Sequence, residues 1–203
     1  MDLRLPIAAV GVCTALLSVQ ALFATSEYRR IGGDILIGVT LVTGILTGFT
    51  ASSDPLTSAN FLRYVDEGFY NGGQFHRSVK MDNQPQNAVK IEVIQASVAA
   101  ARAKDQYPPI ALERTTKTRL RHQDGAVSMA RGGPDTAQSD FFICIGDQPS
   151  LDFGGARNPD GQGFAAFGRV VRGMETVRKI QQEPVTAQKL TPPVRILKVQ
   201  RTP

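Results

Sequence analysis

The stretch Gly68-Phe-Tyr-Asn-Gly-Gly-Gln-Phe-His-Arg77 joins an expected helix to an expected strand. The helix begins at Asp54-Pro55, because Asp is a favoured N-cap and Pro a favoured first helical residue. Gly68 ends it. Its apolar side comprises Leu56, Phe61, Leu62 and Val65. Residues 74–95 then predict a strand, a loop over residues 82–87 and a second strand.

Short strands and turns dominate the sequence on both sides of this stretch. Residues 34–49 are rich in β-branched residues and broken by Gly44, which predicts two short strands with a turn between them. Further strands are expected over residues 110–120, 125–130, 141–145, 164–171 and 194–199, helices over residues 98–105 and 174–181, and a glycine-rich loop over residues 152–163. This order predicts a mainly β domain, either a closed antiparallel barrel or a sandwich.

The composition fits a single well-buried domain. The chain has 203 residues, of which 42% are hydrophobic, which suffices for one core and leaves little for a second. Its net charge of +5 is mild, and the densest basic cluster comprises Arg114, Lys117, Arg119 and Arg121. The spacing of that cluster predicts the solvated face of a strand. No aromatic residues interleave with it as a single-strand binder requires, so we expect no nucleic-acid partner.

Potential metal ligands are few. The chain has two histidines, His76 and His122, and two cysteines, Cys13 and Cys144. Cys13 lies in the N-terminal apolar stretch. Cys144 lies in an apolar run, where we expect a small core residue. A zinc site therefore lacks ligands, and we expect neither a metal nor a cofactor.

Residues 5–24 carry no charge and have the character of a signal peptide. Val19-Gln20-Ala21 offers small residues at the positions that a signal peptidase reads. The stretch is also long enough for an uncleaved membrane anchor, and a buried helix of the fold is a third interpretation. We therefore divide the chain into a signal peptide or N-terminal anchor (1–24), a connector (25–33) and a domain (34–203).

Several short motifs remain once chance matches are set aside. Asp152-Phe153-Gly154 lacks the companion motifs of a kinase, and neither histidine lies near the serine-centred elbow of a hydrolase. The remaining motifs follow one another in order: Phe75-His76-Arg77, Gly125 to Ala130, Gly133 to Thr136, Ser139 to Ile143, Leu151-Asp152 and Phe164 to Val170. Together they resemble the cyclophilins, and particularly a small bacterial branch of that family, over residues 44–199.

The resemblance implies a closed eight-stranded antiparallel barrel capped by two helices, with a peptide groove on its outer face. It makes Arg77 the catalytic residue, Phe142 the floor of a proline pocket and Leu151 one of its walls. Ala130 and Arg131 would offer backbone groups to an extended substrate. The implied substrate-binding residues are His76, Val93, Gln95, Ala130, Arg131, Phe142, Leu151 and Phe164. Of these, His76 is expected to support the site and not to act as an acid or base.

Some positions depart from the usual cyclophilin pattern. An insertion separates Arg77 from Gln95. Ser150 stands where the family has a pocket tryptophan, and Phe164 stands where a pocket histidine is common. Arg131 replaces an asparagine, a change that a backbone contact tolerates. These departures bear on rate, substrate range and inhibitor affinity more than on the fold.

The activity implied is peptidyl-prolyl cis/trans isomerisation, which needs no nucleophile, metal or cofactor. A fixed arginine can donate a hydrogen bond to the prolyl nitrogen as the peptide bond rotates. From the leader and the family branch we expect export to the bacterial periplasm, and a barrel with this charge balance favours a monomer. The expected substrates are proline-containing polypeptides, whose folding the chain would assist. One alternative is a non-catalytic cyclophilin-fold chaperone or scaffold that binds proline-containing segments. Another is an unrelated exported β-barrel that binds small ligands.

Overall fold

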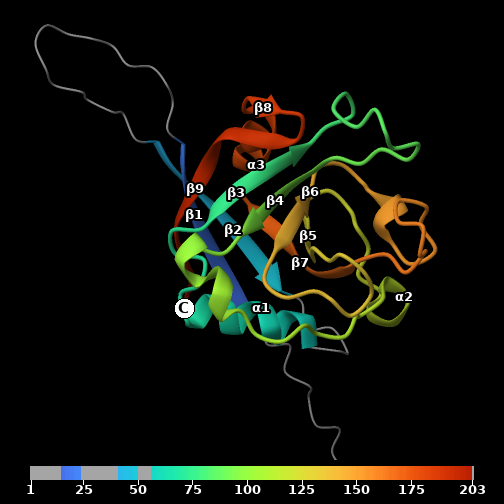
Figure 1. The fold of residues 1–203 in the computed structure, drawn as a ribbon. Coiled ribbons are helices and arrows are strands. Elements are labelled where there is room, and N and C mark those ends of the chain that lie inside the picture. The colour runs from blue at the N-terminus through green and yellow to red at the C-terminus, as the bar shows by residue number, and fades with distance from the viewer. Residues whose placement is uncertain (1–14, 24–40, 50–55, 203) are drawn as a thin grey trace, which may run out of the picture.

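The computed structural model describes residues 15–23, 41–49 and 56–202. An antiparallel sheet dominates them, with the strand order β1-β2-β7-β5-β6-β4-β3-β9-β8 (Figure 1). The strands are β1 (Ala15–Phe23), β2 (Leu41–Phe49), β3 (Gln74–Val79), β4 (Val93–Ser97), β5 (Ala126–Met129), β6 (Phe141–Cys144), β7 (Ala165–Arg172), β8 (Val185–Thr186) and β9 (Lys189–Thr202). The expected mainly β antiparallel fold is confirmed. The described residues hold nine strands where eight were expected, because the short β8 pairs with β9.

Two helices lie at opposite ends of the sheet (Figure 1). They are α1 (Leu56–Asp66) and α3 (Met174–Gln182), both close to their expected positions. The shorter helical segments are the 3-10 turns η1 (Ala100–Asp105) and η2 (Pro149–Leu151) and the single turn α2 (Thr115–Thr118). Within the described part of the chain, none of the helices has the length and apolar character needed to cross a membrane.

The start of α1 is fixed by a side chain that is distant in the sequence. The backbone N–H groups of Leu56 and Thr57 donate to the carboxylate of Glu113 at 3.2 and 2.7 Å. A carboxylate at this place satisfies two unpaired helix donors and complements the helix dipole. The expected N-cap pair Asp54-Pro55 lies outside the described residues. At the other end, Gly68 has a φ of 69° and ends the helix as predicted.

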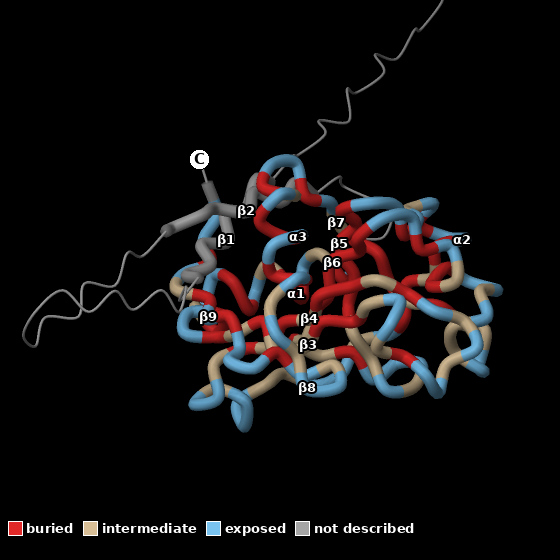
Figure 2. The backbone as a smooth tube through the Cα atoms, turned by 90° about the horizontal axis from the view of Figure 1, so that it is seen from above, coloured by how far each residue is buried: buried red, intermediate tan, exposed pale blue. Residues whose placement is uncertain are grey.

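Aromatic side chains tie α1 to the strands that carry the site. The ring of Phe141 in β6 packs edge-on against three other rings. They are Phe61 of α1 at a centroid distance of 5.2 Å, Tyr70 of the turn after α1 at 5.4 Å, and Phe75 of β3 at 6.1 Å. All four side chains are buried, and Figure 2 shows the buried residues gathered along the strands. The Tyr70 hydroxyl donates to the Ser139 carbonyl at 2.6 Å. Edge-on ring pairs of this kind stabilise a core beyond the area they bury.

The strand expected over residues 110–120 is absent. Ile110 forms an isolated bridge with Ala137, and the chain then turns into α2, where the N–H groups of Lys117 and Thr118 donate to the Arg114 carbonyl. The threonines there favour a strand, but β-propensity depends on a neighbouring strand, and beyond this bridge the described residues provide none. The basic cluster is therefore not the face of a strand.

Residues 15–23, part of the expected leader, form β1. This strand pairs with β2 on one side, from Ala15 opposite Phe49 to Phe23 opposite Leu41, and with β9 on the other. β2 runs without a break through Gly44, where a turn was expected. The pairing puts residues 15–23 in the same sheet as the domain expected to begin at residue 34. Cleavage of a leader remains a prediction.

Removal of residues 1–21 should destabilise the domain. The shortened chain keeps only residues 22 and 23 of β1, so the edges of β2 and β9 lose hydrogen-bonded neighbours. We expect the free energy of unfolding in urea to fall by more than the roughly 0.5–3 kcal/mol typical of one substitution. A chain lacking residues 1–14, which keeps β1, is the matched control. Equal stability of the two shortened chains would contradict the pairing of β1.

Candidate active site

A cavity of about 220 Å³ lies beside β3, β4 and β6. Its lining residues are Arg77, Ile91, Val93, Gln95, Ala130, Arg131, Phe142, Leu151, Arg157, Asn158 and Phe164. The structure therefore brings the predicted catalytic arginine together with every predicted substrate-binding residue except His76. Most of the apolar members belong to a second hydrophobic cluster, separate from the main core.

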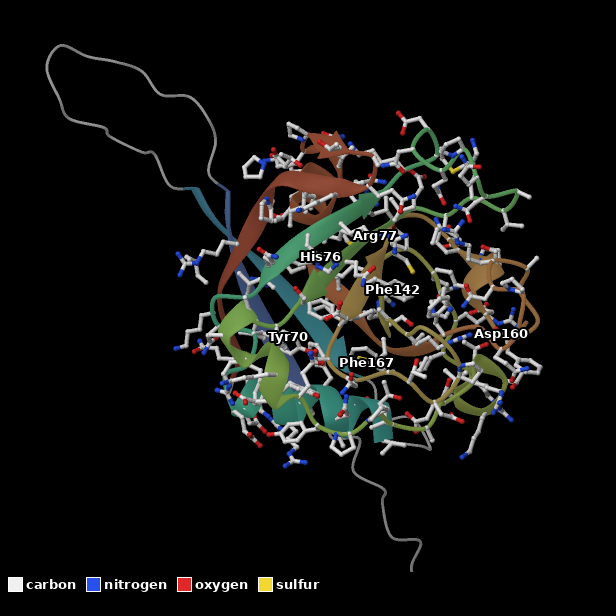
Figure 3. The ribbon with its side chains drawn as sticks, viewed as in Figure 1. Tyr70, His76, Arg77, Phe142, Asp160 and Phe167 are labelled. Carbon is white, nitrogen blue, oxygen red and sulfur yellow. The ribbon has the colours of Figure 1, made fainter. Side chains whose placement is uncertain are left out.

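A β-bulge in β3 sets the position of Arg77. Phe75 lies opposite Ala96 and Arg77 lies opposite Gln95, so the register shifts at His76. A bulge of this kind redirects the side chains that follow it. Arg77 thereby reaches the cavity beside Phe142 (Figure 3), whereas the half-buried His76 does not line it. Burial lowers the pKa of His76, although the charge of Asp140 partly opposes this.

The Arg77 guanidinium is held by two neutral amides. Its Nε and Nη2 donate to Gln188 Oε1 at 2.9 and 2.6 Å, and its Nη1 donates to Gln95 Oε1 at 3.0 Å. Gln188 in turn donates through Nε2 to the Asn83 carbonyl at 3.1 Å. Burial lowers the pKa of Arg77, and the charge of Arg157 lowers it further. An arginine remains charged despite such a shift.

The apolar part of the cavity is built from rings. Phe142 and Phe164 meet edge-on at a centroid distance of 5.3 Å, and Leu151 is buried beside them. The imidazole of His122 stacks on the Phe142 ring, with the two ring centroids 6.0 Å apart and an interplanar angle of 15°. Phe142 and Leu151 therefore both line the cavity, and the roles of floor and wall of a proline pocket that the resemblance implies for them stay a prediction.

His122 forms a buried network that the sequence did not reveal. Its Nδ1 lies 2.7 Å from Asp152 Oδ1 and its Nε2 lies 2.9 Å from Ser128 Oγ. These distances resemble a serine–histidine–aspartate triad. However, Ser128 is 0% exposed and His122 1% exposed, so a substrate cannot reach the hydroxyl. The network supports the floor of the cavity by fixing the imidazole under Phe142.

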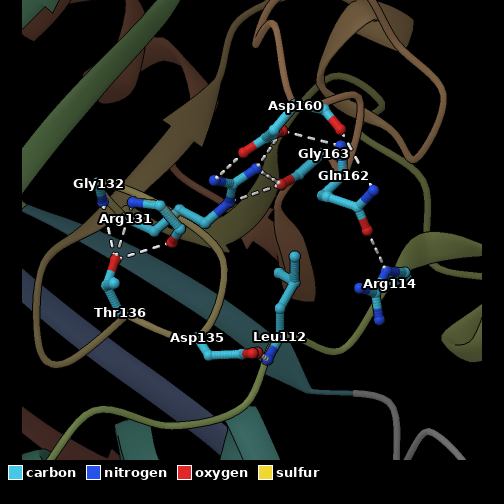
Figure 4. Close-up of polar contacts among 10 residues, drawn as sticks. Leu112, Arg114, Arg131, Gly132, Asp135, Thr136, Asp160, Gln162 and Gly163 are labelled. Atoms are coloured by element: carbon cyan, nitrogen blue, oxygen red, sulfur yellow. Dashed lines mark hydrogen bonds and ion pairs between the residues drawn. The ribbon is translucent and has the colours of Figure 1, made fainter.

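Arg131 contributes its side chain as well as its backbone. Its Nε and Nη2 donate to the Gly163 carbonyl at 2.8 and 2.6 Å, and its Nη1 and Nη2 donate to the Asp160 carboxylate at 2.8 and 3.0 Å (Figure 4). The guanidinium carbon lies 4.9 Å from the centroid of the Phe164 ring. Gly163 has a φ of 66°, and a Cβ there would lie 2.5 Å from the Asp152 carbonyl carbon. The loop before Phe164 thus packs tightly against the cavity wall.

Ile91, Arg157, Asn158 and Gln188 were not predicted as site residues. Ile91 belongs to the insertion, where the buried Gln84 donates to the Ile91 carbonyl and accepts from the Ile91 N–H. Arg157 and Asn158 belong to the glycine-rich loop. The four residues lie in turns and loops, whose side-chain directions follow from long-range contacts that no local pattern encodes.

The described residues hold no group of three His, Cys, Asp or Glu side chains arranged to bind a metal ion. Cys144 is a free thiol that is 0% exposed, as expected of a small core residue. Burial raises its pKa, which keeps it protonated and unreactive.

The structure thus places a fixed arginine beside a cavity with an apolar part. Comparisons with known proteins then show the family to which the chain belongs. The family model for cyclophilin type peptidyl-prolyl cis-trans isomerases matches residues 44–201. Peptidyl-prolyl cis-trans isomerase A of Dickeya dadantii is 37% identical over 129 residues, which are 63% of this chain and 60% of that protein. Peptidyl-prolyl cis-trans isomerase-like 3 of Mus musculus is 32% identical over 143 residues, which are 68% of this chain and 76% of that protein.

A crystal structure of a Cryptosporidium parvum cyclophilin type peptidyl-prolyl cis-trans isomerase matches with a TM-score of 0.66 at 19% identity, covering 94% of this chain and 98% of that one. This match shows a shared fold. The chain belongs to the cyclophilin-type peptidyl-prolyl cis-trans isomerase family. The predicted enzyme class is confirmed at this level, and an unrelated β-barrel is excluded.

Replacement of Asp152 by Asn should destabilise the domain at neutral pH. Partial burial raises the pKa of Asp152, but hydrogen bonds from the His122 ring and N–H outweigh it, so the pKa lies below its ordinary value. A carboxyl group whose pKa is lower in the folded chain than in the unfolded chain stabilises the fold at pH values above its unfolded pKa. This stabilisation is lost as the pH falls below about 4 and the group becomes protonated in the folded chain. We expect Asp152→Asn to lower the free energy of unfolding by roughly 1.5–3 kcal/mol at pH 7.

Urea unfolding at pH 7 and pH 3 measures this effect, and the gap between the two proteins should narrow at pH 3. Asp82→Asn, at an exposed position, is the control. A gap that widens on acidification would show that Asp152 is not stabilised as a carboxylate.

Proposed function

We propose that this chain accelerates cis/trans isomerisation of Xaa-Pro bonds in polypeptides. The observation that carries this proposal is the Arg77 guanidinium, held from two sides at a cavity that has apolar side chains in one part. Phe142, Leu151 and Phe164 supply the apolar surface for a prolyl ring. Another crystal structure of the same Cryptosporidium parvum protein, in the presence of the dipeptide Ala-Pro, matches with a TM-score of 0.64. It supports proline-containing peptides as the substrate class.

The chemistry follows from the electronic structure of the peptide bond. Rotation is opposed by about 18–20 kcal/mol because the nitrogen shares its lone pair with the carbonyl. During rotation this lone pair localises on the prolyl nitrogen, which then becomes a better hydrogen-bond acceptor. A donor held at that nitrogen therefore binds the transition state more strongly than either planar isomer.

Arg77 has donors left for this task. Its bonds to Gln188 and Gln95 use the Nε hydrogen, one hydrogen on Nη2 and one on Nη1. One N–H therefore remains on each terminal nitrogen. Both acceptors are neutral amides, so the positive charge of the guanidinium is not cancelled by a carboxylate bonded to it. The rigid fork also keeps the free donors in place, which a lysine would not do.

A non-catalytic module that binds proline-containing segments is the second candidate. Ser150 and Phe164 depart from the usual cyclophilin pattern, which motivates this alternative. Against it, Arg77 lines the cavity and keeps two N–H donors that bond to no other described residue, an arrangement that simple binding of an apolar ring does not require.

The finer expectations are proposals as well. We infer that β1, by pairing with both β2 and β9, joins the sheet into the closed barrel expected of the family. We also propose that the chain belongs to a bacterial branch, is exported to the periplasm, acts as a monomer and assists folding of exported proteins. Cleavage after Ala21 would remove most of β1, so the unfolding comparison of the shortened chains also tests cleaved export.

Arg77→Ala should abolish most of the acceleration in the full chain. We expect kcat/KM for an Xaa-Pro peptide, measured by exchange NMR, to fall by about 100-fold or more, as when a donor to a transition state is removed. Arg77→Lys keeps the charge but not the fork, and should lose most of the activity too. A near-native far-UV spectrum confirms that the variants fold.

If the parent chain shifts the peptide resonances but does not accelerate isomerisation, the non-catalytic binding module is favoured. Undiminished acceleration by a folded Arg77→Ala variant would remove Arg77 from the reaction.

A further inference from the structure

We propose that Arg157 makes this cavity selective for Xaa-Pro segments that carry a carboxylate next to the proline. The inference rests on the proposed function and adds a substrate class to it. Arg157 comes from the glycine-rich loop between Asp152 and Phe164, and it lines the same cavity as Arg77.

The charges around the cavity are unbalanced. Arg77 and Arg157 are close enough for the charge of one to lower the pKa of the other, and no aspartate or glutamate lines the cavity. The third arginine, Arg131, is neutralised, because its buried guanidinium makes two bonds to the Asp160 carboxylate. Two uncancelled positive charges therefore face the substrate.

Arg157 itself has spare donors. Its Nη1 donates to the Val89 carbonyl at 2.7 Å, and within the described residues no carboxylate forms an ion pair with it. A guanidinium has further N–H groups in a planar fork that matches a carboxylate. Burial lowers the pKa of Arg157 without discharging it. A partly desolvated, unpaired cation is stabilised by an anion that a ligand supplies.

The position of Arg157 is fixed before a substrate arrives. Its N–H donates to the Ser150 carbonyl at 3.2 Å, and Gly154 bonds to Gly161 across the loop at 2.7 Å. Arg131 fastens the end of the loop at Gly163 (Figure 4). The contact with Val89 joins this loop to the insertion. Preorganisation of this kind reduces the entropy that binding costs.

A polar hollow that adjoins the cavity gives the site a direction. This hollow, of about 330 Å³, shares Gln95, Ala130 and Arg131 with the cavity and is also lined by Asp140. Arg157 lines the cavity but not the hollow. An extended chain that crosses both would thus meet a carboxylate at one end and an unpaired guanidinium at the other. The acidic substrate residue belongs on the flank that passes Arg157.

Matched peptides test this proposal in the full chain. Each peptide carries Glu or Gln directly before or directly after the proline, and kcat/KM is measured by exchange NMR. We expect the Glu peptide to exceed the Gln peptide by about two- to fivefold on one flank at low salt, the range of a partly exposed ion pair. The ratio should shrink as ionic strength rises.

Arg157→Gln should bring that ratio close to one. The substitution leaves the backbone bonds from residue 157 to the Ser150 carbonyl and from Gly154 to the Gly161 carbonyl, so the loop stays fastened. Arg169→Gln, at an exposed arginine outside the cavity, makes the same change in net charge and should preserve the ratio.

Ratios near one on both flanks in the parent chain would overturn the inference while leaving the isomerase activity standing. A preference that survives Arg157→Gln would overturn it too. If the peptides bind without acceleration, the proposed activity fails. In that case the dissociation constants of the Glu and Gln peptides, measured by NMR titration, test the inference by themselves. Tighter binding of the Glu peptide on one flank would support it, and equal binding would overturn it. Absence of binding by every peptide would overturn both.

Discussion

The pair of hydrogen bonds from Arg77 to Gln188 Oε1 is the constraint on which the site depends. Gln188 lies in the turn between β8 and β9, where Ala187 adopts a φ of 58°. The turn holds one edge of the guanidinium, and Gln95 of β4 holds a terminal nitrogen. Because both acceptors are neutral, the orientation of Arg77 is fixed while its charge stays available. A carboxylate in either place would have bound the arginine more tightly and weakened its field.

Two irregular segments complete the cavity. The insertion after β3 is held by the buried Gln84 and by Asn83, whose carbonyl accepts from Gln188. The loop before Phe164 is held by Arg131, through Gly163 and Asp160. These segments include departures from the usual cyclophilin sequence, and they meet where Arg157 bonds to Val89. The two segments therefore supply part of the cavity lining beside Arg77 and Phe142.

The sequence predicts best where local chemistry decides the structure. Gly68 ends α1, as predicted, because a glycine favours the left-handed conformation. The network around His122 escaped prediction because Asp152 lies 30 residues away in sequence. A helical turn replaces the strand expected over residues 110–120, because within the described residues no neighbouring strand is available there to pair with. An apolar N-terminal stretch fits a leader as well as it fits a strand, and hydropathy alone does not distinguish them.

The most direct test of this account is the effect of Gln188→Met on isomerisation by the full chain. Methionine has a similar size but cannot accept the two bonds from Arg77, and Gln188 does not line the cavity. The account predicts that kcat falls by up to about 100-fold, as expected when a reacting group is misplaced, while KM for a neutral Xaa-Pro peptide stays nearly the same. An unchanged kcat in a folded variant would contradict the claim that a fixed Arg77 drives the reaction.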